Sequence, residues 1–296
     1  MERYYSLNTY FKNKYGQKIG KLSLDGGFSC PNRDGSLSTG GCIFCSEKGA
    51  GEFSSAGNIL DQIADQKIRL QKKWKVNKFI GYFQNFTNTY GPINKLKSLY
   101  YQVLEDPDIV GLAIATRADC LDEQVLDLLE DLAKTTDLWL EIGMQSVKAQ
   151  TIAYINRGYS HDYLKTKLEE LKKRNIKFVL HVIFGLPGES EEDMLKSIAF
   201  VNESGAFGIK IHSLYIQTDS RLYQAYLEEN FPLLSKDQYT DLVVKALTLL
   251  NKDLVVHRIT GDGDKKKLVA PLWAADKLAV IGLINKKLKV LDEKKP

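Results

Sequence analysis

The sequence predicts an α/β fold, a partial (β/α)6 barrel of the TIM type followed by a C-terminal extension. Short apolar runs alternate with amphipathic helical segments along most of the chain, and this alternation is typical of a parallel sheet with right-handed crossovers. Six such units can be traced, fewer than the eight of a closed barrel. Polar and glycine-containing motifs follow the runs, where parallel sheets place their binding sites.

The six expected strands are short apolar runs, of which the first is the weakest. They cover residues 21–24, 78–83, 110–115, 138–143, 178–184 and 208–215. The segments between them carry apolar residues three or four positions apart, which places those residues on one face of a helix. The helices that this spacing predicts cover residues 59–74, 96–103, 125–132, 164–171 and 194–201.

The final third of the chain continues with a helix over residues 238–250, an apolar run over 254–259 and a helix that begins near Pro271. We interpret it as an extension of the barrel domain, with a separate small domain as the alternative. The predicted organisation is an N-terminal aromatic and basic segment (1–20), a partial barrel (21–230) and a C-terminal extension packed on the barrel (231–296).

The composition allows a large core and gives a mildly basic chain. Hydrophobic residues make up 44% of the 296 positions, and the formal net charge is +4. The longest apolar run, residues 278–284, is far shorter than the roughly 20 residues that span a bilayer, and the first residues lack the apolar stretch of a secretory signal. We therefore expect a cytoplasmic location and no membrane partner. The charge is compatible with a nucleic-acid partner without requiring one.

Three of the four cysteines crowd into one short segment. Eleven residues separate Cys30 from Cys42, and two separate Cys42 from Cys45. Clustered cysteines in a chain without a secretory signal indicate metal ligands or redox groups rather than disulfides. Three thiolates can hold three irons of a 4Fe-4S cluster and leave the fourth iron free for a substrate. The alternatives are a zinc site, a redox pair or inert buried thiols, and the isolated Cys120 is expected to be a small buried hydrophobic residue.

The cysteine segment resembles that of the radical S-adenosylmethionine (SAM) superfamily. The similarity is to the branch with a long gap between the first two cysteines, which includes the catalytic subunit of Elongator, whereas the widely known spacing has three residues in that gap. The resemblance implies that Cys30, Cys42 and Cys45 hold a 4Fe-4S cluster. It also implies SAM as the second cofactor, reductive cleavage of SAM as the activity, and an electron donor such as flavodoxin or ferredoxin.

Further motifs resemble the SAM-binding elements of the family. Phe44 stands where the family has an aromatic residue near the adenine. Gln145 and Ser146 end the stretch Glu-Ile-Gly-Met-Gln-Ser, which resembles the end of the family's fourth strand, whose polar groups face SAM. Arg157 lies in Asn-Arg-Gly, which resembles an arginine motif, so it is expected to pair with the SAM carboxylate through two parallel hydrogen bonds. A lone arginine is otherwise more often a solvated charge.

Three more stretches resemble the motifs of the family to different degrees. The family's Gly-Gly-Glu after the second strand is replaced here by Gln-Asn at positions 84–85. Gln84 is the expected substitute for binding the methionine amine, with Asn85 as the alternative. Residues 185–189 and 210–214 resemble the fifth-strand turn and the sixth strand, although Gly and Pro mark turns in every fold. His181 and His212 lie in apolar strands and are more often core histidines than ligands.

Both ends of the chain resemble a bacterial, MnmL-like subgroup. The matching stretches are Gly-Phe-Ser-Cys-Pro-Asn-Arg-Asp-Gly at 27–35, Val-His-Arg-Ile-Thr-Gly-Asp-Gly at 256–263 and Leu-Val-Ala-Pro-Leu-Trp at 268–273. This resemblance implies action on the wobble uridine of tRNA. The carboxymethyl part of a carboxymethylaminomethyl group would be removed to leave an aminomethyl group. His257 and Arg258 are the expected substrate-binding residues.

Aromatic residues at positions 4–15 alternate with basic ones, which offers stacking and phosphate contacts to RNA. The alternative is that these aromatic side chains pack against the open edge of the barrel. Two other functions stay open. One is a radical SAM enzyme that oxidises or decarboxylates a small molecule of the porphyrin type, and the other is a non-catalytic, metal-containing protein that binds RNA.

Overall fold

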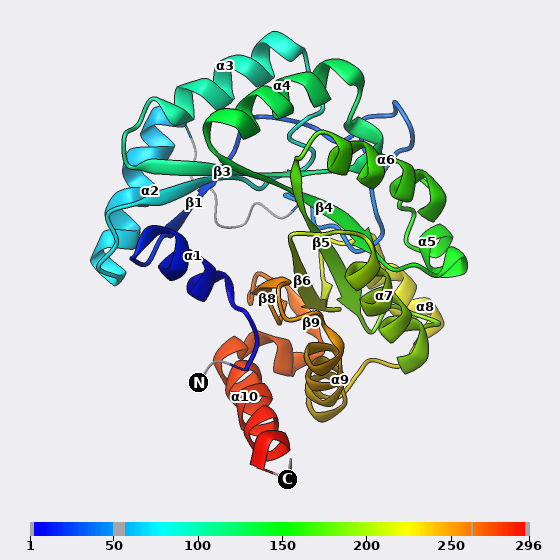
Figure 1. The fold of residues 1–296 in the computed structure, drawn as a ribbon. Helices are drawn as coiled ribbons and strands as arrows, with labels where there is room; N and C mark the ends of the chain where they lie inside the picture. The colour runs from blue at the N-terminus through cyan, green and yellow to red at the C-terminus, as the bar shows by residue number, and fades with distance from the viewer. Residues whose placement is uncertain (1–2, 50–56, 262, 294–296) are drawn as a thin grey trace.

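A computed structural model of the chain describes residues 3–49, 57–261 and 263–293. Seven of the described strands form a curved parallel sheet, open on one side, with most helices on its convex face (Figure 1). The strand order is β1-β2-β3-β4-β5-β6-β8, so the predicted partial TIM-type barrel is confirmed. Residues 1–2 of the expected N-terminal segment, Asp262 of the C-terminal motif and residues 294–296 of the expected extension lie outside the described residues.

All six predicted strands are present, each within one or two residues of its expected bounds. They are β1 (Gly20–Leu24), β2 (Phe79–Phe83), β3 (Ile109–Thr116), β4 (Asp137–Gln145), β5 (Lys177–Phe184) and β6 (Gly208–Ser213). The side chains in β2 are buried throughout, as expected for a strand covered on both faces.

The predicted helices cover the outside of the sheet. They are α2 (Ile59–Lys73), α3 (Ile93–Leu104), α4 (Glu123–Thr135), α6 (His161–Lys173) and α7 (Glu191–Glu203). Two shorter helices, α5 (Ala149–Tyr154) and α8 (Arg221–Glu229), were not expected from the apolar spacing. Ser190 begins α7 with a capping box. Its hydroxyl accepts from the backbone N–H of Asp193, and the Asp193 carboxylate accepts from the backbone N–H of Ser190.

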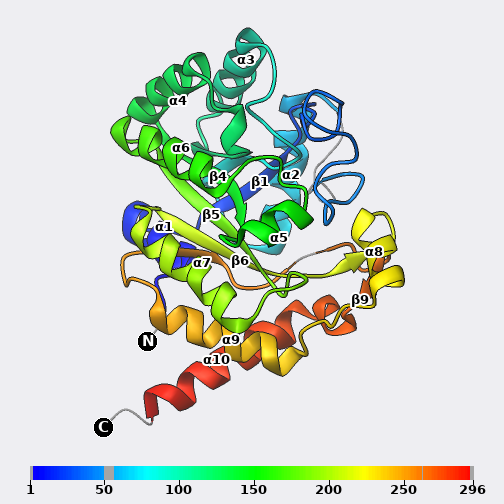
Figure 2. The ribbon, with the colours of Figure 1, turned by 90° about the vertical axis from the view of Figure 1, so that its right-hand side faces the viewer.

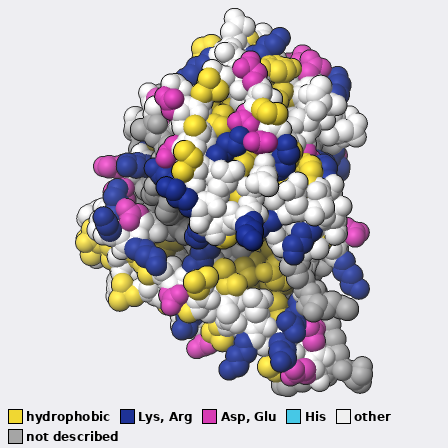
Figure 3. Space-filling view, turned by 90° about the vertical axis from the view of Figure 1, so that its left-hand side faces the viewer, with side chains coloured by type: hydrophobic (Ala, Val, Ile, Leu, Met, Phe, Trp, Pro, Cys, Tyr) yellow, Lys and Arg dark blue, Asp and Glu magenta, His cyan; other side chains and the backbone are white. Residues whose placement is uncertain are grey.

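Helix α1 (Leu7–Tyr15) closes the end of the barrel at which the strands begin. Phe11 is buried next to Trp139, and the hydroxyls of Tyr10 and Tyr15 donate to the carboxylate of Asp137. Phe11 therefore packs into this end of the barrel, whereas Tyr10 and Tyr15 are half-buried against it, which favours the packing alternative for these three aromatic residues. Lys and Arg side chains are numerous on this face of the molecule and interleave with Asp and Glu (Figure 3).

The C-terminal part of the chain completes the sheet. Helix α9 (Lys236–Leu249) packs between α7 and α10 (Lys277–Glu293) (Figure 2). Strand β8 (Val255–Arg258), the expected apolar run, pairs with β6 as the seventh strand, and β9 (Leu268–Ala270) pairs with β7 (Ile216–Gln217). The boundary drawn at residue 230 stays a prediction. Among the described helices, none is long and apolar enough to cross a membrane.

Candidate active site

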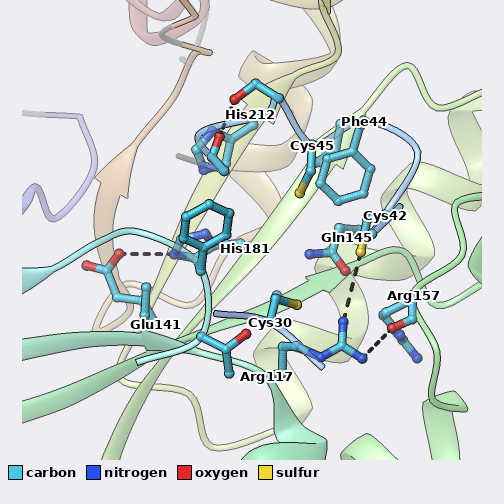
Figure 4. Close-up of a pocket in the computed structure, with 18 of the residues that line it drawn as sticks. Cys30, Cys42, Phe44, Cys45, Arg117, Glu141, Gln145, Arg157, His181 and His212 are labelled. Carbon is cyan, nitrogen blue, oxygen red and sulfur yellow. Dashed lines mark hydrogen bonds and ion pairs between the residues drawn. The ribbon is translucent and has the colours of Figure 1, made fainter. Parts of the chain in front are cut away.

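A cavity of about 250 Å³ lies at the carboxyl ends of the strands. Its wall includes Cys30, Cys42 and Cys45, and the three sulfur atoms face one shared space (Figure 4). The cavity continues inward to Glu141 and Lys210, which lie inside the barrel. The predicted cysteine segment and the strand ends therefore form one site, as the geometry of parallel sheets requires.

Backbone hydrogen bonds fold the cysteine segment over the strand ends. The carbonyl of Cys30 accepts from Arg33 N at 2.8 Å, and the carbonyl of Cys42 accepts from Cys45 N at 3.0 Å. Gly40 and Gly41 have φ values of 83° and 75°, a left-handed conformation that favours glycine. This local requirement explains the paired glycines directly before Cys42.

The thiol of Cys42 lies among hydrogen-bond donors. Asn32 Nδ2 is 3.6 Å and Arg117 Nη1 is 4.0 Å from its sulfur. The neighbouring Cys45 thiol and the positive charge of Arg117 lower the pKa of Cys42 to about 7, against the opposing effect of burial. A thiolate is the form that binds a metal. The described cysteines are all free. The space that Cys30, Cys42 and Cys45 share and the lowered pKa of Cys42 fit a cluster held by three thiolates.

Cys120 lies outside this group. It does not line the cavity, and its thiol points to Asp119 at 3.8 Å. Burial and the charge of Asp119 raise the pKa of Cys120, so the thiol stays protonated. Cys120 is half-buried rather than fully buried, and its exclusion from the cluster ligands stays a prediction.

Arg117 is a site residue that the motif analysis missed. Its guanidinium lies between Cys42 and the arginine motif: Nη2 donates to the carbonyl of Arg157 at 2.7 Å and to Asp119 Oδ2 at 2.7 Å. The signal was present in the sequence, because the segment Arg-Ala-Asp-Cys directly follows the third strand.

The expected SAM-binding residues divide into two groups. Phe44, Gln84, Gln145 and Arg157 all line the cavity. Ser146 does not, because it is fully buried and its hydroxyl donates to the Glu189 carboxylate. Burial raises the pKa of Glu189 to about 7.

The Arg157 side chain is only 1% exposed and is largely occupied by the protein's own backbone. Nη1 donates to the carbonyl of Met144 at 2.6 Å and to that of Ser146 at 3.3 Å, and Nε donates to that of Tyr159 at 3.1 Å. Nη2 has no hydrogen-bond partner among the described residues. One guanidinium nitrogen is thus left for a ligand, where a bidentate pair with a carboxylate requires two.

The expected substrate-binding pair is also divided. Arg258 lines the cavity, whereas His257 does not. The His257 ring is stacked edge-on against Trp139 and Phe207, with ring centroids 5.6 and 5.7 Å apart. Successive residues of a strand point to opposite faces, so only one of these two neighbours can face the substrate directly.

The inner wall of the cavity contains a buried charge cluster. Glu141, itself 1% exposed, accepts from Lys21 at 2.9 Å, from Lys210 and from Trp139 Nε1 at 3.2 Å, and lies 3.2 Å from His181 Nε2. The two lysines hold the pKa of Glu141 well below its usual range despite its burial. Charged residues inside apolar strands are the sequence signal that marks this cluster.

Comparison with known families shows the superfamily of the chain. The radical SAM superfamily matches residues 35–201, and the radical SAM C-terminal domain matches residues 206–290. The chain belongs to the radical SAM superfamily. It is 40% identical to the protein YtqA of Bacillus subtilis, over 97% of the chain and 90% of YtqA. It is 27% identical to Elongator complex protein 3 of Dictyostelium discoideum, over 57% of the chain and 30% of that relative.

The fold of this radical SAM protein is also found in a solved relative. The structure of Elp3 from the archaeon Methanocaldococcus infernus covers 93% of the chain with a TM-score of 0.69 at 17% identity. The chain spans 63% of that structure, so the likeness concerns the fold. As a member of this superfamily, the chain has SAM and a 4Fe-4S cluster as its cofactors.

Proposed function

We propose that this radical SAM enzyme acts on the wobble uridine of tRNA and converts a carboxymethylaminomethyl group to an aminomethyl group. The observation that carries the proposal is the aromatic and cationic wall of the cysteine-lined cavity. Phe86 and Tyr215 line it together with Arg33, whose guanidinium lies 5.4 Å from the Phe86 ring centroid. A base turned out of its stack is bound by such aromatic and guanidinium planes. The motifs at both ends of the chain support the same substrate.

Within this proposal each cavity residue has a role. Cys30, Cys42 and Cys45 hold the cluster, which when bound supplies the electron that cleaves SAM to methionine and a 5′-deoxyadenosyl radical. Phe44 and Gln145 line the SAM site together with Gln84 and one guanidinium nitrogen of Arg157. Ser146 and His257 do not line the cavity. Ser146 supports the SAM site through its hydrogen bond to Glu189. His257 supports the substrate side through Trp139, which donates to the cavity residue Glu141.

The position of hydrogen abstraction follows from the chemistry of the substituent. The CH2 between the amine and the carboxylate is the preferred carbon, because the adjacent nitrogen stabilises a radical there. Loss of one hydrogen atom to the 5′-deoxyadenosyl radical and of one further electron, returned to the oxidised cluster, would leave an imine. Hydrolysis would then break the N–C bond and release the carboxymethyl carbons as glyoxylate, leaving the aminomethyl group. The chain must keep water from this carbon while the radical exists. Deep placement inside the barrel, next to the buried Glu141 cluster, provides such a position.

The test is the reaction itself. The protein is reconstituted without oxygen and incubated with SAM, flavodoxin or a chemical reductant, and tRNA that carries carboxymethylaminomethyl-uridine. Mass spectrometry should detect SAM-dependent aminomethyl-uridine together with 5′-deoxyadenosine. If 5′-deoxyadenosine forms while the tRNA stays unchanged, the substrate is wrong and a small-molecule substrate takes its place.

A further inference from the structure

The inner end of the cavity is built from nitrogen-bearing side chains on three adjacent strands. In the parallel register His181 of β5 pairs with Lys210 of β6, and Lys210 pairs with Arg258 of β8. All three side chains line the cavity. Lys210 precedes the last residue of β6, Ser213, by three positions. These three side chains therefore lie inside the barrel rather than at its rim.

Two ammonium groups share one carboxylate in this region. Lys21 Nζ lies 2.9 Å from Glu141 Oε1, and Lys210 Nζ is paired with Oε2. Within the described part of the chain, Glu141 is the one carboxylate bonded to these lysines. Burial, together with the charges of Lys21 and Arg258, lowers the pKa of Lys210, as expected where cations outnumber anions in a poorly solvated site. A second anion beside Lys210 would offset this excess of positive charge.

His212 adds a buried nitrogen without a hydrogen bond to the described residues. It follows Lys210 by two positions on β6, so both side chains lie on the same face of the strand. Its Nε2 is buried and has no hydrogen-bond partner among the residues described, and His212 also lines the cavity. A buried polar atom without a partner is costly, and a ligand that bonds to it recovers that cost.

We propose that this inner end of the cavity is a subsite for the carboxylate of the substrate, bound by Lys210 with Arg258 and His212 beside it. The inference rests on the proposed function, because the carboxymethylaminomethyl group ends in a carboxylate. Ammonium, guanidinium and imidazole N–H groups are the donors that a carboxylate accepts. Binding there holds the reacting CH2 between the inner wall and the cysteines. The aminomethyl product lacks the carboxylate and loses this contact.

The chain offers a matched pair of variants. Lys210→Met and Lys21→Met each remove one ammonium from Glu141 and leave it the other lysine. Lys210 lines the cavity, whereas Lys21 does not. A structural role for the ion pairs predicts similar effects of both substitutions. A carboxylate subsite predicts that Lys210→Met alone abolishes recognition of the anion.

The probes are N-ethylglycine, which reproduces the end of the substituent, and N-ethylglycinamide, which has the same shape without the charge. Their affinities for the reconstituted holoenzyme are measured by ligand-observed NMR. The wild type and Lys21→Met should prefer N-ethylglycine about tenfold or more, as a charge-assisted hydrogen bond provides. Lys210→Met should bind both ligands equally weakly. Lys210→Gln, which keeps a hydrogen-bond donor toward Glu141, should behave in the same way and replaces Lys210→Met if that variant does not fold.

SAM also carries a carboxylate, so its affinity is measured in parallel by equilibrium dialysis. The proposal expects an unchanged SAM affinity in the Lys210 variants. It is overturned if these variants lose SAM instead, if the wild type shows no preference between the probes, or if Lys210→Met and Lys210→Gln retain the preference. Because the probes contain no RNA, a preference for N-ethylglycine without conversion of the tRNA would keep the subsite and reject the proposed tRNA substrate.

Discussion

The guanidinium of Arg117 lies 4.0 Å from the thiol sulfur of Cys42 and also donates to the carbonyl of Arg157 at 2.7 Å. One side chain thus connects an expected cluster ligand with the motif expected at the SAM site. Positive charge and hydrogen bonds near the sulfur atoms raise the reduction potential of an iron–sulfur cluster. Arg117 is therefore expected to act as a positioning residue that also sets the potential.

Arg117→Gln should lower the midpoint potential of the cluster while the cluster still forms. The expected change is on the order of tens of millivolts, which corresponds to about 1 kcal/mol for a one-electron couple. A redox titration followed by electron paramagnetic resonance measures it. The control is Arg174→Gln, because Arg174 pairs with Glu123, Asp127 and Glu130 on the outer surface. An unchanged potential in Arg117→Gln would remove the electrostatic role.

The ligand assignment predicts a sharp division among the cysteines. Replacing Cys30, Cys42 or Cys45 by Ala should remove the cluster and the SAM-dependent formation of 5′-deoxyadenosine, because three thiolates are the minimum for three irons. Cys120→Ala should retain both, since Cys120 does not line the cavity. Iron and sulfide content and 5′-deoxyadenosine are the measurements. Normal iron content in any of the first three variants would contradict the assignment.

Asp137 should make the stability of the protein depend on acid pH. Burial alone would raise the pKa of Asp137, but its ion pairs with Lys14 and Lys177 lower it below the usual value. A carboxyl group with a lowered pKa stabilises the fold above its unfolded pKa of about 4, and this contribution disappears as the pH falls through the folded pKa.

Asp137→Asn is expected to reduce the free energy of unfolding by about 1–3 kcal/mol at pH 7, since the lost bonds involve charged partners. The difference from the wild type should shrink when urea unfolding is repeated near pH 3. Asp131→Asn, at an exposed pair with Lys134, is the control and should have little effect at either pH. A difference that stays constant with pH would show that Asp137 does not act through its charge.

The strands and most helices could be predicted because apolar periodicity records which face of each element is buried. Contacts between distant residues leave no such record. Tyr10 and Tyr15 look like an exposed aromatic segment in the sequence, yet their hydroxyls meet Asp137, more than 120 positions away. For the same reason the motif indicated that both Gln145 and Ser146 bind SAM. The structure places Gln145 in the cavity and Ser146 against Glu189.

Glu189 provides a pH dependence of the opposite sign. Burial raises the pKa of Glu189 to about 7, above its usual 4.5. A carboxyl group with a raised pKa favours the folded state below its unfolded pKa, and this contribution is lost as the pH rises through 7. Glu189→Gln, which keeps a polar partner for Ser146, should therefore be more stable relative to the wild type at pH 8 than at pH 5. Urea unfolding at the two pH values tests this, and a reversed order would contradict the raised pKa.

Arg157 can be tested for two separate roles. Three carbonyl groups accept from its guanidinium, and each would lose a buried donor, at a cost of about 1–3 kcal/mol if left unsatisfied. Arg157→Lys keeps the charge but cannot reproduce the planar fork. The unfolding free energy without SAM should therefore fall, and the SAM affinity should fall as well because Nη2 is removed. Calorimetry without SAM and equilibrium dialysis with SAM separate the two effects. If Arg157→Lys kept its full stability and lost only SAM, the backbone bonds would be incidental and Arg157 would be a ligand residue alone.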